Sequence, residues 1–294
     1  MNDSSFPAAA GRKLVFLHLP KTGGTTLHHH FSAAFTPEEI CPERFSRLDA
    51  IPADTLARYR YFSGHFNFEQ VRLVPGPSYV VTVLRDPAER ILSTYYFWKR
   101  HRPEIVRSHN LAGPAAARAT DLLGFLQSTD PAVRDAIENT MARYLAGGVN
   151  ITAEGTYAFP SGDASVLVTD MEVIHRATGN LMAVDHFGFT PQLGEVYAKV
   201  CWEFRMKRLP QLAKLNTRES ESPHLEPIET EEITPAIRAE LDRLTVLFGH
   251  DNVVVELTDH GYPTDSTHND LLARLAADLG LPVVATNNVH HARP

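Results

Sequence analysis

The chain has 294 residues, of which 43% are hydrophobic and 21% charged, and its formal net charge is −7 at pH 7. A chain of this length and composition can bury a substantial hydrophobic core without disulfide bonds or metal ions. The negative charge argues against a general binder of nucleic acid or of anionic membranes, because such proteins need a positive surface. A small anionic ligand would need only local positive charge.

The cysteines and the N-terminal residues give an expectation about the cellular location of the protein. Cys41 and Cys201 stand far apart and show no metal-binding spacing, so neither a disulfide framework nor a metal site is expected. Residues 1–12 are polar, and the apolar run that follows them is too short to span a membrane. No export signal is visible. We therefore expect a cytoplasmic, bacterial-type protein without a membrane span.

Two strand–turn–helix units are visible in the first hundred residues. Residues 13–18 form a short apolar run that predicts a buried parallel strand, followed by two glycines and a helix that reaches Phe35. Residues 78–84 predict a second buried strand. Asp86 and Pro87 then predict a helix start, and the helix runs to Arg100.

The rest of the chain continues this alternation. It predicts a short strand within residues 59–65, largely helical structure over 120–146, a strand at 164–169, a helix over 193–209, a loop over 216–232 and a helix over 235–247. Repeated alternation of strands and helices indicates an α/β fold. We predict a P-loop-like parallel sheet flanked by helices.

The first turn has the composition of a phosphate-binding loop. Backbone N–H groups of a glycine-rich turn and the positive end of the following helix attract anions. Lys21 adds a mobile charge, and the hydroxyls of Thr22, Thr25 and Thr26 can donate hydrogen bonds to phosphate oxygens. Lys21 precedes the glycines, whereas in the Walker A pattern the lysine follows them, which disfavours an ordinary ATPase or GTPase. A solvated turn that only caps the helix is the alternative.

The second strand ends in a further anion-binding candidate. Arg85 follows this strand, and Ser93 lies on the helix behind it. An arginine fork and a hydroxyl can hold a terminal phosphate. Ligands of open α/β sheets bind outside the carboxyl ends of the strands, where both this segment and the Lys21 loop are predicted.

The segments LPKTGGTTL (19–27) and VLRDPAERILSTYY (83–96) resemble the two cofactor motifs of sulfotransferases that use 3′-phosphoadenosine 5′-phosphosulfate (PAPS). The branch with heparan and dermatan sulfate 2-O-sulfotransferases and their bacterial relatives is the most similar. The resemblance implies transfer of a sulfuryl group to an acceptor hydroxyl, with 3′,5′-bisphosphoadenosine as product. It also implies that the 3′-phosphate is held by Arg85 and Ser93, and the 5′-phosphosulfate by Lys21, Thr22, Gly23, Gly24, Thr25 and Thr26.

The same resemblance implies catalytic roles for His65 and Lys21. His65 matches the position of a histidine general base, although Ser63 stands where glycan 2-O-sulfotransferases carry another histidine. A neutral imidazole can take a hydroxyl proton during in-line attack on sulfur, while Lys21 neutralises the leaving oxygen. The alternative is that His65 only hydrogen-bonds a loop. Phe187–Thr190 and Asn216–Arg218 loosely resemble later family segments, and we predict structural roles for them.

Three consecutive histidines follow the predicted phosphate loop. We predict that His28, His29 and His30 are surface residues, because neighbours on a helix do not converge on one ion.

From about Phe248 the sequence resembles a piece of the PHP domain of error-prone DNA polymerase alpha subunits. This stretch predicts one βαβ unit as a C-terminal appendage. His290 resembles a metal-ligand position, but the rest of that site is missing, so independent phosphoesterase activity is not expected.

The sequence thus predicts a flexible N-terminus (1–12), a sulfotransferase domain (13–247) and an appended fragment (248–294). Two other functions remain open: a phosphoryl-transfer enzyme that uses ATP or GTP, and a non-catalytic nucleotide-binding protein. The acceptor is a glycan, lipid or small-molecule hydroxyl. Neither its identity nor the oligomeric state follows from the sequence.

Overall fold

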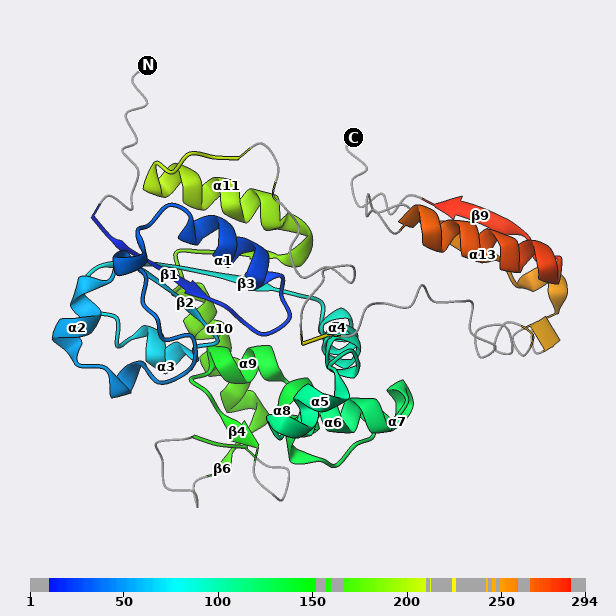
Figure 1. The fold of residues 1–294 in the computed structure, drawn as a ribbon, viewed down its shortest axis with the longest axis horizontal. Helices are drawn as coiled ribbons and strands as arrows, with labels where there is room; N and C mark the ends of the chain where they lie inside the picture. Colours follow the sequence, from blue (N-terminus) through cyan, green and yellow to red (C-terminus); the bar gives the residue numbers. More distant parts are fainter. Residues whose placement is uncertain are drawn as a thin grey trace. The chain divides into compact units, whose positions relative to one another are not determined.

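A computed structural model describes residues 11–151, 157–159, 167–209, 212, 224–225, 242, 245–246, 249–258 and 265–286. The chain divides into two compact units, residues 1–227 and 228–294, and each is described by itself (Figure 1). The predicted boundary at 247/248 marks where the sequence resemblance changes, and it stays a prediction.

A four-stranded parallel sheet forms the centre of the first unit. Its strands lie in the order β2-β1-β3-β7, with bounds β1 Lys13–Leu17, β2 Tyr61–Gly64, β3 Ser78–Leu84 and β7 His186–Phe189. In the register of the sheet, Leu17 lies opposite Gly64 on one side and Thr82 on the other. All four strands run in the same direction, so the segments that follow them emerge at one edge. The predicted α/β class with a parallel sheet is confirmed.

Helices cover both faces of this sheet, because alternate residues of β1 point to opposite sides. Leu14 and Phe16 belong to the core on one face, whereas Val15 and Leu17 belong to the core on the other, and all four are fully buried. The first face is covered by α1 (Gly24–Ser32) and α11 (Leu193–Phe204). The second is covered by α2 (Ala53–Arg58), α3 (Phe68–Val71), α9 (Thr140–Leu145) and α10 (Asp170–Met182).

The helix after β3 connects the sheet to a group of short helices. This helix, α4 (Pro87–Lys99), packs through Tyr95 and Trp98 against Phe125. The group consists of α5 (Pro103–Ser108), α6 (Ala112–Ala119), α7 (Leu122–Leu126) and α8 (Pro131–Ile137). The helical structure predicted over 120–146 is present as three helices, α7 to α9, because new helix starts with N-caps at Asp130 and Asn139 interrupt it.

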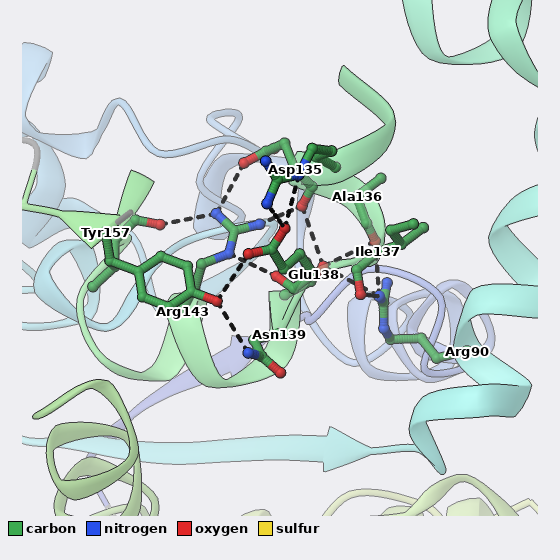
Figure 2. Close-up of polar contacts among 11 residues, drawn as sticks. Arg90, Asp135, Ala136, Ile137, Glu138, Asn139, Arg143 and Tyr157 are labelled. Carbon is green, nitrogen blue, oxygen red and sulfur yellow. Dashed lines mark hydrogen bonds and ion pairs between the residues drawn. The ribbon is translucent and has the colours of Figure 1, made fainter. Parts of the chain in front are cut away.

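Two buried arginines fix α4 to α8 and α9 (Figure 2). Arg90 on α4 donates to the carbonyl of Ala136 at 2.7 Å and lies 3.1 Å from the Thr140 hydroxyl. Arg143 on α9 forms an ion pair with Asp135 at 2.9 Å and donates to the carbonyl of Glu138 at 2.8 Å. A buried guanidinium needs such partners, since burying a charge without them is costly. The network therefore holds α4 in one position against the sheet.

The first unit also contains several smaller elements. Three two-residue strands pair antiparallel, namely β4 (Asn150–Ile151), β5 (Tyr157–Ala158) and β6 (Leu167–Val168). Short 3₁₀ turns are η1 (Pro37–Glu39), η2 (Leu48–Ala50) and η3 (Thr190–Gln192). The strand predicted at 164–169 is observed as β6. Residues 213–223, and with them Asn216–Arg218, lie outside the described residues.

The second unit contains one βαβ element, as predicted. Strands β8 (Val255–Thr258) and β9 (Val283–Thr286) pair in parallel, and α13 (Asp265–Leu279) connects them after the 3₁₀ turn η4 (His250–Asn252). A small core joins the helix to this pair through Val253, Val255, Ala276 and Leu281. The predicted helix over 235–247 lies mostly outside the described residues, and His290 lies outside them.

Within the described part of the chain, none of the helices combines the length and the apolar character that crossing a membrane requires.

We expect removal of residues 248–294 to leave the affinity for 3′,5′-bisphosphoadenosine, the product implied by the sulfotransferase resemblance, unchanged within about twofold. The reason is that every predicted ligand-binding residue belongs to the first unit. Isothermal titration of the full chain and of residues 1–247 compares the two affinities. Loss of binding by a shortened chain that still melts cooperatively would contradict the division into two functional parts.

Candidate active site

The predicted phosphate loop lies between β1 and α1, and its backbone is left-handed at two places. Lys21 has a φ of 66° and Gly23 a φ of 80°. Gly23 is the N-cap of α1, so this position has no side chain that could cap the helix, and no acidic residue occupies the first turn. The positive end of α1 is therefore available to an anion from outside the helix. This geometry agrees with the strand, glycine turn and helix that the sequence predicts.

The glycines of the loop are needed for close packing. A Cβ atom on Gly24 would lie 2.0 Å from the imidazole of His18, and one on Gly23 would lie 2.8 Å from Leu193. Both distances are below any van der Waals contact. His18 is buried behind the loop, and Leu193 begins α11. The loop is thus held between the end of β1 and the start of α11.

The threonines of the loop differ in what they can do. The Thr22 side chain is fully buried, and its hydroxyl donates to the carbonyl of Leu19 at 2.9 Å. A hydroxyl has one proton to donate, and that of Thr22 is already used in this bond. Thr22 would therefore bind an anion through its backbone N–H. Thr25 and Thr26 stand in the first turn of α1, with Thr26 buried and Thr25 half-buried.

Arg85 lies beside the loop, as the parallel sheet predicts. Its guanidinium donates to the carbonyl of Lys21 at 3.3 Å and forms an ion pair with Glu89 at 3.3 Å. Asp86 caps α4 by accepting from the N–H of Glu89 at 3.0 Å. Ser93 follows Glu89 by four residues, so both lie on the same side of the helix. Ser93 is half-buried.

The ammonium of Lys21 rests on an aromatic ring that the sequence analysis missed. Its Nζ lies 3.8 Å from the centroid of Phe97, within the range of a cation–π contact. Burial, together with the smaller effects of the charges on Arg85 and Arg100, lowers the pKa of Lys21 to about 8. Phe97 follows Ser93 by four residues. This spacing, Glu89–Ser93–Phe97, is the signal in the sequence that could have identified Phe97.

His65 follows β2 at the same edge of the sheet. Its Nδ1–H donates to the carbonyl of His18 at 2.8 Å, because a carbonyl can only accept. This bond assigns the proton to Nδ1 and leaves Nε2 as the basic nitrogen of the neutral ring. Burial lowers the pKa of His65, although the bond to His18 acts in the opposite direction. The imidazole is therefore neutral at pH 7.

A fourth segment reaches the loop from β7. The Thr190 hydroxyl lies 3.1 Å from the carbonyl of Leu84 and 3.4 Å from that of Thr22. It thus bridges the end of β3 and the phosphate loop. The sequence analysis assigned Phe187–Thr190 a structural role. Thr190 fills such a role directly beside the predicted cofactor residues.

The expectation that His28, His29 and His30 are all surface residues is wrong for two of them. His30 is buried, and His28 is half-buried, with its Nδ1 3.1 Å from the Tyr61 hydroxyl. Only His29 is exposed. Because α1 packs on the sheet through this side, two of the three histidines face the protein. Among the described residues, no group of three or more His, Cys, Asp or Glu side chains could hold a metal ion.

Comparison with known proteins identifies the first part of the chain. Residues 6–143 match the model of the Sulfotransferase family. This part of the chain is similar to proteins of that family. The matched region includes the phosphate loop, β2 with His65, and β3 with α4, which together form the candidate site. The elements of the first unit after residue 143, among them β7 and the following Thr190, lie beyond the match.

Individual relatives match over short stretches. A protein-tyrosine sulfotransferase of Arabidopsis thaliana is 34% identical over 86 residues, which is 29% of this chain and 17% of the plant protein. Error-prone DNA polymerases of Cutibacterium acnes and Nocardia farcinica are 63% and 50% identical over 54 and 60 residues, about a fifth of this chain and 5% of each polymerase. The chain therefore spans only a small part of each of these relatives. The polymerase matches agree with the resemblance to error-prone DNA polymerases that the sequence indicates.

The lowered pKa of Lys21 predicts a pH dependence of anion binding. Below pH 8, Lys21 is protonated before the ligand binds. Above pH 8 it is mostly neutral, so Lys21 must take up a proton when the phosphate binds. The affinity for 3′,5′-bisphosphoadenosine should therefore fall as the pH rises above 8, by up to about tenfold per unit. Calorimetric titration between pH 7 and 9.5 measures this slope.

Lys21→Arg is the matched variant, because arginine stays charged throughout this range. Its affinity should change little with pH. An equal slope in the wild type and in Lys21→Arg would assign the titration to another group.

Proposed function

We propose that this chain is a sulfotransferase that transfers a sulfuryl group from PAPS to an acceptor hydroxyl. The observation that carries the proposal is the arrangement of three predicted segments at one sheet edge, within the region that matches the family. The guanidinium of Arg85 donates to the carbonyl of Lys21, and His65 donates to the carbonyl of His18 at the start of the same loop.

The residues present suit a nucleotide with phosphate at both ends. The uncapped N-terminus of α1 and the ammonium of Lys21 would hold the 5′-phosphosulfate. Arg85 and Ser93 would hold the 3′-phosphate from the start of α4. Lys21 and Arg85 lie close enough for the charge of one to lower the pKa of the other. Such an excess of positive charge in a partly buried place favours a polyanion.

His65 and Lys21 would act on opposite ends of the reacting bond. The acceptor oxygen attacks sulfur and its proton passes to Nε2 of His65, while the bond from sulfur to the phosphate oxygen breaks. Lys21 neutralises the charge that grows on this phosphate oxygen as 3′,5′-bisphosphoadenosine leaves. The bond from Nδ1 to the His18 carbonyl orients the imidazole for this role.

The acceptor class is part of the proposal. The relative from Arabidopsis is described as a protein-tyrosine sulfotransferase, so a phenolic hydroxyl joins the glycan, lipid and small-molecule hydroxyls expected from the sequence. A screen with sulfur-labelled PAPS over these four acceptor classes identifies the substrate. The cytoplasmic location and bacterial origin expected from the sequence stay predictions.

Substitution of the two cationic residues tests the donor. We expect Lys21→Ala and Arg85→Ala each to weaken binding of 3′,5′-bisphosphoadenosine by about 10- to 100-fold, the effect of losing one hydrogen bond to a charged group. Arg72→Ala is the control, because Arg72 directly follows α3 and pairs at the surface with Glu69. Isothermal titration gives the three dissociation constants.

Unchanged affinity in both variants would refute the assignment of the site. Magnesium-dependent binding of ATP that is tighter than binding of the bisphosphate would favour a phosphoryl-transfer enzyme instead.

Replacement of His65 tests the base. His65→Gln should lower turnover by about 10²- to 10⁴-fold while the affinity for 3′,5′-bisphosphoadenosine stays the same, because a general base acts on the acceptor proton only. His175→Gln serves as control, since His175 is exposed on α10. Labelled sulfate transfer and bisphosphate titration are measured on the same preparations. Full turnover in His65→Gln would refute the assignment of His65 as the general base.

A further inference from the structure

The ring of Phe97 lies where a counter-ion of Lys21 would be expected. The Nζ of Lys21 lies over this ring, 3.8 Å from its centroid, so the ammonium contacts the ring face. Within the part of the chain that the structure describes, no carboxylate forms an ion pair with Lys21, and Glu89 pairs with Arg85 instead. The ring face is therefore the observed partner of this charge.

Both sides of the contact have further support from the protein. The backbone of Lys21 is left-handed, with a φ of 66°, and its carbonyl accepts from the guanidinium of Arg85 at 3.3 Å. Phe97 lies on α4, and the ring of His101 packs edge-on against it, with centroids 4.9 Å apart and an angle of 85° between the planes. The Nδ1–H of His101 donates to the carbonyl of Phe97 at 3.0 Å. The ring is thus held by α4 and His101 in addition to its contact with Lys21.

A distant segment of the first unit holds the end of α4. Leu225 is buried and pairs with His101 in an antiparallel bridge. The N–H of Arg102 donates to the carbonyl of His224 at 3.0 Å, and its Nε donates to the carbonyl of Leu225 at 3.2 Å. The position of Phe97 beside the phosphate loop therefore depends on packing from two directions.

The charged and titratable groups that influence Lys21 are positive or neutral. Arg85, which follows β3, and Arg100, which follows α4, both disfavour its protonation, and no acidic group is among the influences. The other groups coupled to its charge are the histidines His18, His65 and His101. A carboxylate here would neutralise the lysine and compete with an incoming anion, whereas an aromatic face attracts a cation without carrying a net charge.

We propose that Phe97 is a positioning residue for Lys21: the face of its ring holds the ammonium beside the phosphate loop in place of a carboxylate, so the positive charge stays available to the phosphosulfate group of the donor. This inference rests on the proposed function in naming the donor. The hold of the ring on the ammonium is a property of the protein alone, and it can be tested without a ligand.

Fluorination of the ring gives the direct test, because fluorine withdraws electrons from the ring face and changes the size of the ring little. Mono-, di- and trifluorinated phenylalanine are placed at position 97 of the full chain, which carries lysine labelled with ¹³C at Cε. The Lys21 resonance is assigned by its absence in Lys21→Arg, and its midpoint is followed by NMR titration. The wild-type midpoint, expected near pH 8, should fall with each added fluorine, because the ring favours the charged lysine. The same midpoint in all four proteins would overturn the proposal.

Substitution of the ring extends the test. Phe97→Leu keeps an apolar side chain without an aromatic face, and it should lower the Lys21 midpoint by about half a unit to one unit. Phe97→Tyr keeps the face and should stay close to the wild type. Trp202→Leu is the matched control, because Trp202 is half exposed on α11 and makes the same kind of contact with Lys199, at 4.9 Å. An unchanged Lys21 midpoint in folded Phe97→Leu would contradict the inference.

The pH dependence of ligand binding separates positioning from a merely structural role. Phe97→Leu should bind 3′,5′-bisphosphoadenosine about threefold more weakly than the wild type at pH 8 and almost equally at pH 6, because more of its Lys21 is neutral at the higher pH. Weakening by the same factor at every pH would refute the positioning role. If the wild type does not bind the bisphosphate at all, the proposed donor fails, while the lysine titration still decides whether the ring holds Lys21.

Discussion

The site depends on the central place of β1 in the parallel sheet. β1 lies between β2 and β3, so the residues that follow these three strands must emerge side by side. The phosphate loop, His65 and Arg85 are those residues. Two carbonyls of the β1–α1 connection, those of His18 and Lys21, then accept hydrogen bonds from the side chains of His65 and Arg85. The loop therefore organises both of its neighbours in addition to forming an anion-binding turn.

The charges around this loop are mainly positive. Lys21 is partly buried among cations, and its ammonium contacts the face of an aromatic ring. The histidines behind the loop have lowered pKa values, with burial as the main cause, so they stay neutral beside these cations. Cations that lie this close repel one another, and a polyanionic ligand relieves this repulsion. The buried arginines of Figure 2 keep α4, which contributes Ser93 and Phe97 and directly follows Arg85, in place while this charge is present.

Local signals predicted most of the fold. Residues 78–84 form a strand with the predicted bounds, and the Asp86–Pro87 start of α4 is as expected, because a buried apolar run and a helix cap are both encoded within a few residues. The contacts of Phe97 and Thr190 were missed because each depends on where a distant segment packs. For the same reason the burial of His30 against Tyr197 was not foreseen. The roles assigned to the site residues stay predictions, whereas their proximity at one sheet edge is observed.

The order of strands has a consequence for how the domain can be divided. The outer neighbour of β3 is β7, which comes a hundred residues later in the chain and beyond residue 143, where the family match ends. A fragment cut at that residue would expose the backbone of β3 along one side, an edge onto which strands of other molecules can add. During synthesis the same edge stays uncovered from the time β3 has emerged until His186–Phe189 has left the ribosome, so the nascent chain carries an aggregation-prone surface during this interval.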